Sequence, residues 1–126
     1  MKCKICAKAD VNPTEDIDKV IKAISNVFEY DEIMVEDQYI CASGNFDTIK
    51  KFGGELKERK IRSAARKIML KGITSNKIKF KLSKQAALVG TLNLVEDDLS
   101  PLGEINVEIQ TNQVKKLIDY LAPELK

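Results

Sequence analysis

Three stretches of this sequence alternate strictly between apolar and polar residues, and this period of two constrains the fold more than any other feature. In Lys77–Ser83, Ile78 and Phe80 point to one side and the lysines to the other. Lys2–Val11 and Glu104–Thr111 alternate in the same way. Such a pattern predicts β-strands with one buried face. A sheet built from these strands needs an apolar layer that covers that face.

Apolar residues at helical spacing supply this layer. They form stripes over residues 17–28, 45–71 and 114–121, each typical of a helix with one buried side. Within the second stripe the apolar side rotates after Gly53-Gly54, so we expect a bend there or two helices in succession. The remaining expected features are strands at Ile33–Glu36, Tyr39–Ser43 and Leu88–Val95, N-cap candidates Asn12 and Thr14, and a turn at Ser100–Gly103.

These elements predict one α+β domain spanning residues 1–126. Its helices are expected to pack on one face of a mostly antiparallel sheet, in two layers. No stretch approaches the roughly 20 apolar residues of a membrane span. The first residues also lack the long apolar run of a secretion signal, so we expect a cytoplasmic protein without a membrane partner.

Positive charge is concentrated in one part of the chain. Residues 50–84 contain 13 Lys and Arg and two acids, whereas the rest of the chain contains 8 basic and 17 acidic residues. Segregated charge creates a local field, although a solvated lysine-rich surface would have the same composition. We interpret the segment as a site for a polyanion, because a helix and a strand both carry the charge.

The helix is expected to present two outward rows of basic residues. Arg59, Arg62 and Arg66 would form one row, and Lys60, Lys67 and Lys71 the other. On the strand, Lys77, Lys79 and Lys81 share one face at intervals of about 6.6 Å, two residues of ~3.3 Å each. That interval is comparable to the separation of successive phosphates along a nucleic acid strand.

The surroundings of the lysine strand leave one alternative open. Glu104 and Glu108 lie on the outward side of their own strand and would neutralise these lysines as cross-strand pairs if the two strands were neighbours. The outward lysines of the first strand, Lys2, Lys4 and Lys8, are placed outside the predicted patch.

Little in the sequence supports catalysis or metal binding. The chain has no histidine, which removes the commonest general base and metal ligand. Cys3 and Cys6 have C-x-x-C spacing, but residues three apart on a strand point to opposite faces, so we expect structural cysteines. Glu96-Asp97-Asp98 lacks partners at ligand spacing and is interpreted as a solvated hairpin tip. We therefore predict a protein that is not an enzyme and holds no metal or other cofactor.

The aromatic residues narrow the kind of polyanion. Proteins that bind single strands stack bases on exposed aromatic side chains, but this chain has no Trp, and Phe28, Phe52 and Phe80 fall on apolar sides. Charge without stacking favours structured or double-stranded RNA, recognised by its backbone and shape. The alternative is a protein-interaction subunit or homodimer whose basic patch meets an acidic protein.

Four short motifs carry a resemblance to a known family. They are Pro13–Asp16, Leu82–Gly90 with its Lys84-Gln85-Ala86-Ala87 centre, Ser100–Gly103 and Ile118–Pro123. Together they resemble a family of small archaeal proteins described as predicted RNA-binding proteins of unknown precise role. The resemblance implies an α+β fold related to the ribosomal protein that holds the five-S RNA, and a link to RNA processing or the exosome.

The Lys84–Ala87 motif lies between two expected strands without a glycine or proline for a turn. We expect Lys84 and Gln85 to contact phosphate or sugar, while the two alanines admit another surface or pack in a wide bend or bulge. The partners expected are structured or double-stranded RNA, proteins of an RNA-processing complex and a second copy of the chain. The predicted RNA-binding residues are Arg59, Lys60, Arg62, Arg66, Lys67, Lys71, Lys77, Lys79, Lys81, Lys84 and Gln85.

Overall fold

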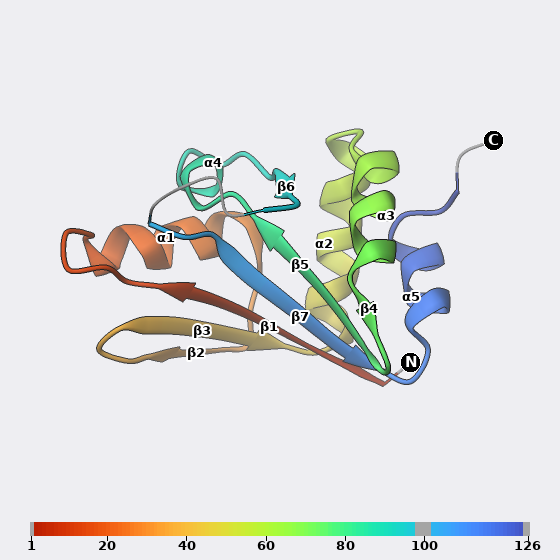
Figure 1. The fold of residues 1–126 in the computed structure, drawn as a ribbon, viewed down its shortest axis with the longest axis horizontal. Helices are drawn as coiled ribbons and strands as arrows, with labels where there is room; N and C mark the ends of the chain where they lie inside the picture. The colour runs from red at the N-terminus through yellow and green to blue at the C-terminus, as the bar shows by residue number, and fades with distance from the viewer. Residues whose placement is uncertain (1, 98–101, 125–126) are drawn as a thin grey trace.

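The fold, seen in a computed structural model, is described for residues 2–97 and 102–124 (Figure 1). The strands are β1 (Cys3–Asp10), β2 (Glu32–Val35), β3 (Tyr39–Gly44), β4 (Ile73–Thr74), β5 (Lys77–Leu82), β6 (Leu94–Val95) and β7 (Ile105–Thr111). The helices are α1 (Ile17–Val27), α2 (Phe46–Glu58), α3 (Arg62–Lys71), α4 (Lys84–Leu88) and α5 (Val114–Leu121). Asp98 and the first half of the expected turn at Ser100–Gly103 lie outside the described residues.

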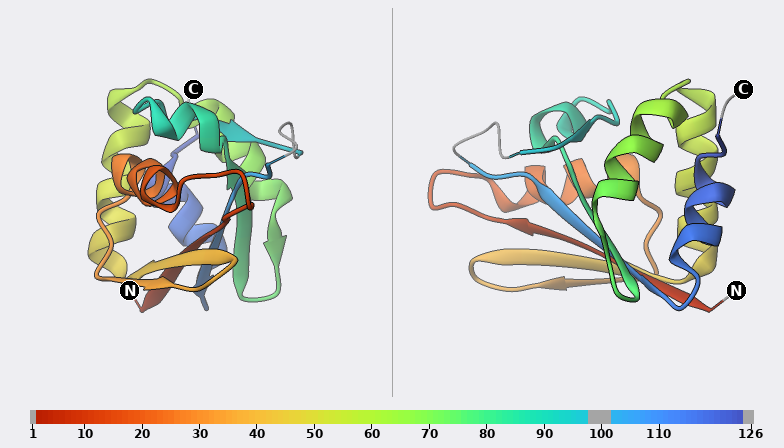
Figure 2. Two further views of the ribbon diagram at one scale, coloured as in Figure 1. Left: turned by 90° about the vertical axis from the view of Figure 1, so that its left-hand side faces the viewer. Right: turned by 45° about the vertical axis from the view of Figure 1, so that its right-hand side comes forward.

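The strands form one antiparallel sheet. Its order is β2-β3-β1-β7-β5-β4, and β6 pairs with the free end of β5. Ile5, Ile109 and Ile78 lie side by side across the three central strands and are buried. The helices gather over this face, along the upper side of the sheet in Figure 1, and the opposite face is open (Figures 1 and 2). The predicted two-layer α+β fold is confirmed.

Three phenylalanines join the two layers of the core. Phe28 stacks on Phe52 with ring centroids 5.2 Å apart, and Phe52 stacks on Phe80 at 5.7 Å. All three rings are at most 5% exposed, which confirms that they lie on the apolar sides of their elements. Burial of rings of this size contributes about 2–3 kcal/mol each.

The long helical stripe forms two helices in succession, one of the two arrangements expected. The break between them is not at the glycines. α2 runs through Gly53-Gly54 and ends at Glu58, and Lys60 adopts a left-handed φ of 60° before α3 begins. Gly53 lies in regular helix, and its missing side chain leaves room for α5. A Cβ there would be 2.9 Å from Leu121 Cδ2. The glycine thus serves close helix packing, and Gly72 ends α3 as expected.

The segment after β5 folds as a helix and not as a strand. The hydroxyl of Ser83 accepts a hydrogen bond from the amide of Ala86 at 3.1 Å and caps α4, whose residues are good helix formers. Ala87 is buried, and the Asn26 side chain of α1 donates to its carbonyl at 2.9 Å. The predicted strand Leu88–Val95 was therefore wrong over most of its length, and α4 is the connection that the Lys84–Ala87 motif builds.

Two smaller predictions have mixed outcomes. The hairpin of β2 and β3 forms as expected. The N-cap of α1 is Asp16, whose carboxylate accepts from the Asp18 amide at 3.0 Å, and not Asn12 or Thr14. Asn12 instead donates to the Leu102 carbonyl at 2.9 Å. Within the described residues, no helix is long and apolar enough to cross a membrane.

Candidate nucleic-acid interface

The open face of the sheet brings together lysines that are far apart in the sequence. β7 lies between β1 and β5, so Lys8, Asn106 and Lys81 form one row across the sheet, and Lys4, Gln110 and Lys77 form another. Side chains in one such row point to the same side. We call the set formed by Lys4, Lys8, Lys77, Lys79 and Lys81 the lysine face.

The lysine face is hollowed into a groove along β7. Its widest part, of about 620 Å³, is lined by Lys8, Lys79 and Lys81, together with Lys71 at the end of α3. A second hollow of about 420 Å³ shares Cys6 and Glu108 with the first and continues past Lys4. The groove therefore follows the strands over most of their length and is open to solvent.

Acidic residues pair with some of the lysines around this groove. Lys77 Nζ lies 2.9 Å from Glu108 Oε1, and Lys71 Nζ lies 3.1 Å from Glu96 Oε1. Both pairs are exposed, and such pairs contribute only about 0–1 kcal/mol. Lys79 is exposed and makes no ion pair within the described part of the chain. The cross-strand neutralisation considered for Glu108 thus applies to one lysine of the strand.

Glu104 has a different role from the one expected. The prediction that it points outward was wrong, because it precedes β7 and turns inward, where it is 3% exposed. Its carboxylate accepts a hydrogen bond from the Lys84 backbone amide at 3.1 Å. It therefore holds the start of α4 and does not contact the lysines of β5.

The arginines predicted to form one outward row are distributed over different surroundings. Arg59 follows the end of α2 and pairs with Glu55 at 2.8 Å. Arg66 is 11% exposed and donates to Asp119 at 2.7 Å and to the Ala122 carbonyl at 3.0 Å. The hydrogen bond from Arg66 lowers the pKa of Asp119.

These contacts change the interpretation of the helix. The break at Lys60 shifts the phase between Arg59 and the residues of α3, so the three arginines do not share one ridge. Arg66 joins α3 to α5. The exposed basic residues of this region are Arg59, Lys60, Lys67 and Lys71, with Arg62 half-buried.

Lys84 is buried and lies apart from the lysine face. Its ammonium donates to the carbonyls of Asp10 and Leu102, both at 2.8 Å, and pairs with Glu15 at 3.1 Å. Burial alone would raise the pKa of Glu15, but hydrogen bonds from Asn12 and Lys84 outweigh it, and this pKa is lowered. The expected phosphate contact does not fit a side chain that is 7% exposed. Gln85 is exposed beside α1, on the helix-covered side.

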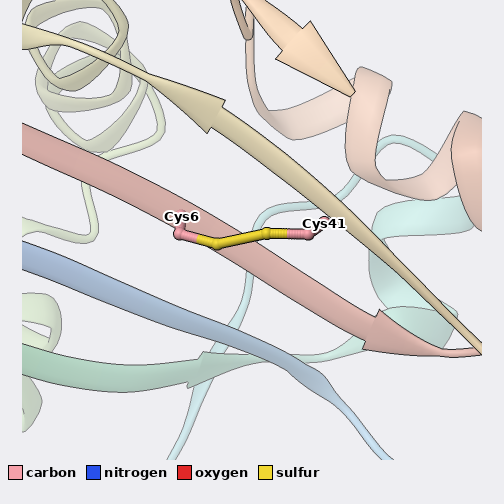
Figure 3. The surroundings of a disulfide bond; sticks show 2 residues. All are labelled: Cys6 and Cys41. Carbon is pink, nitrogen blue, oxygen red and sulfur yellow. A yellow bond between two sulfur atoms is a disulfide. The ribbon is translucent and has the colours of Figure 1, made fainter. Parts of the chain in front are cut away.

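The cysteines are structural, and two of them are joined. Cys6 on β1 and Cys41 on β3 form a disulfide across adjacent strands of the open face (Figure 3). Cys6 also lines the groove, and burial raises the pKa of the Cys3 thiol. No cluster of acidic and cysteine side chains within the described residues has the arrangement of a metal site.

Sequence reasoning missed Lys4 and Lys8. The alternation of the first strand shows that they point outward, but only the strand order shows that β1 lies two strands from β5. The structure therefore brings them onto the same face as the lysines of β5, next to the patch from which the sequence analysis left them out. Lys8 also lies 4.3 Å from the centre of the Tyr39 ring, so an aromatic side chain borders the face.

Comparisons with known proteins identify relatives over almost the whole chain. A family model described as RNA binding matches residues 4–111. The UPF0201 protein of Methanothermobacter thermautotrophicus is 39% identical over 122 residues, covering 97% of this chain and 92% of the relative. The UPF0201 protein of Saccharolobus solfataricus is 37% identical, with 96% and 88% covered.

Solved structures agree with these matches. A crystal structure of an uncharacterized UPF0201 protein superposes with a TM-score of 0.80 at 30% identity, over 96% of this chain and 94% of that one. The UPF0201 protein from Methanococcus jannaschii gives a TM-score of 0.77 at 35% identity, over 98% and 95%. The resemblance noted from the four motifs is thereby confirmed at the level of the family, while the kinship with the ribosomal protein stays a prediction.

Proposed function

Since the chain belongs to the family described as RNA binding, whose relatives here are archaeal UPF0201 proteins, we propose that it binds structured RNA through the lysine face. The observation that carries the proposal is the convergence of β1 and β5 on one hollowed face. Five lysines lie there with one paired carboxylate among the central strands. This arrangement suits phosphates, which a cluster of ammonium groups attracts over several ångströms.

The exposed cations of α3 extend this surface. Lys71 lines the groove, and Lys67 precedes it by one helical turn on the same side of α3. A folded or double-stranded RNA that contacts the helix with its backbone can therefore reach the groove with an adjoining segment. Arg66, Lys84 and Gln85 have other contacts or lie elsewhere, and we leave them out of the proposed site.

In this proposal the protein acts as a binding module and not as an enzyme. The groove contains lysines, amides and the carboxylates of Glu96, Asp97 and Glu108, and the chain has no histidine to serve as a base. A role in RNA processing or ribosome-related work, which the family resemblance implies, would then consist in holding an RNA for other proteins.

Filter binding of a short RNA hairpin, titrated at about 50 mM and 200 mM salt, tests the proposal. If about four lysines each neutralise a phosphate, log K should fall with a slope of about −3.6 against log salt, or roughly 100-fold over this range. Absence of binding at the lower salt concentration, or an affinity independent of salt, would overturn it.

The edge strand β2 favours a second candidate function, the binding of a protein partner. Met34 and Val35 are 58% and 49% exposed, and β2 ends the sheet among the described strands. Exposed strand edges recruit further strands, and the neighbouring Glu32 and Glu36 favour a basic one. Light scattering on the isolated protein separates this candidate from a homodimer, because only the homodimer would give a mass of two chains without a partner.

A further inference from the structure

Charge changes sign across the open face of the sheet. At one side, β5 carries Lys77, Lys79 and Lys81, while at the other the β2–β3 hairpin carries acidic residues. Between them, β1 carries Lys4 and Lys8 outward, and β7 carries Asn106, Glu108 and Gln110. Positive charge is densest along β5, with three lysines against two on β1, so a nucleic acid strand in the groove would favour an orientation with its phosphates toward β5.

We propose that an unpaired segment of the bound RNA lies along β5 with its bases over β7, and that Glu108 selects cytosine over uracil there. This inference rests on the proposed function. The lysines of β5 repeat at about 6.6 Å, and β1 lies about 9.6 Å from β5, two strand spacings away. The groove between them is thus wide enough for bases whose phosphates contact β5.

Glu108 is placed to contact a base and not a phosphate. It lies in the middle of the groove, in one row with Cys6 and Lys79, where its negative charge repels phosphates. Its side chain is 41% exposed, and Lys77 contacts only Oε1. Within the described residues Oε2 has no partner, so it remains available as an acceptor.

The chemistry of a carboxylate determines which base it favours. An ionised carboxylate only accepts hydrogen bonds, and cytosine offers its N4 amino group as a donor. Uracil carries a carbonyl oxygen at the same position, which would face the carboxylate with like partial charge. Asn106 and Gln110 can both donate and accept, so they do not make this distinction.

The test compares oligo-cytidine with oligo-uridine, two unpaired RNAs that differ at this position of the base. Fluorescence anisotropy with ten-nucleotide probes should give an affinity about five- to tenfold higher for oligo-cytidine. Glu108→Gln should raise the affinity for both probes, because it removes a negative charge, and should bring their ratio close to one. Glu36→Gln makes the same charge change outside the groove and should leave the ratio unchanged.

The outcomes separate this inference from the proposed function. Equal binding of the two probes by the unaltered protein, or an unchanged ratio in Glu108→Gln, would overturn the base selection while the lysine face remained an RNA site. Loss of affinity for both probes in equal proportion in Lys79→Ala would support a phosphate contact at β5. Failure of all RNAs to bind would overturn both the inference and the function.

Discussion

Replacement of Lys84 by methionine should destabilise the fold strongly without weakening RNA binding. The side chain of Lys84 is 7% exposed, and its ammonium contacts Glu15 and two backbone carbonyls. Removing one partner of a buried ion pair costs about 3–5 kcal/mol, because the other charge stays buried without compensation. For a chain of this size, such a loss lowers Tm by about 10–20 °C.

Urea denaturation followed by circular dichroism measures this change. Lys22→Met, at an exposed position of α1, is the matched control and should change the free energy of unfolding by about 0.5 kcal/mol or less. Adding Glu15→Gln to Lys84→Met should recover part of the loss, since the orphaned charge is gone. Below its Tm, the Lys84→Met variant should bind an RNA hairpin like the unaltered protein. A loss of stability under 1 kcal/mol together with a marked loss of RNA affinity would show that Lys84 contacts RNA and is not a buried structural cation.

Three further predictions concern stability. Because folding lowers the pKa of Glu15, its ionised carboxylate contributes to the free energy of unfolding above the ordinary pKa of 4.5. That contribution is lost as the pH falls through the lower pKa of the folded state. Glu15→Gln should therefore flatten the fall in unfolding free energy below pH 4.5. Gly72→Ala should lower the free energy of unfolding by about 1–3 kcal/mol, because the new Cβ would collide with the Lys79 carbonyl. Gly54→Ala, with open space around it, should raise it by about 0.5–1 kcal/mol. Thermal melts that rank the two variants the other way would contradict this. Reduction of the Cys6–Cys41 disulfide, which spans 35 residues, should cost about 3–4 kcal/mol in a denaturant titration, and an unchanged midpoint after reductant would speak against the bond.

Much of the fold is predictable from the sequence because half-buried strands and one-sided helices leave strong periodic signals. The alternation in β1, β5 and β7 and the apolar stripes of α1 and α5 are local features, and they fix the two-layer α+β class. The segment 84–88 shows the limit of such reasoning. Its five residues carry no apolar period, and their helical state depends on the Ser83 cap and on packing of Ala87 against α1.

The candidate site was predictable only in part, because it depends on strand order. The lysine row of β5 follows from alternation alone. The contribution of Lys4 and Lys8 requires that β7 lie between β1 and β5, and no local pattern determines this. The burial of Lys84 likewise depends on Asp10 and Leu102, residues distant in the sequence that the fold brings beside it.

Charge reversal on the lysine face distinguishes an RNA site there from a general effect of net charge. Lys8→Glu with Lys79→Glu places acids on both sides of the groove, while Lys22→Glu with Lys116→Glu makes the same change on exposed positions of α1 and α5. Each pair lowers the net charge from +2 to −2. A difference in RNA-hairpin affinity between the two double variants therefore reports a local site and not the overall charge. We expect a loss of about 100-fold for the first pair, because two phosphate contacts become repulsions, and of less than about threefold for the second. Equal losses in both pairs, or an unchanged affinity in the first, would contradict it.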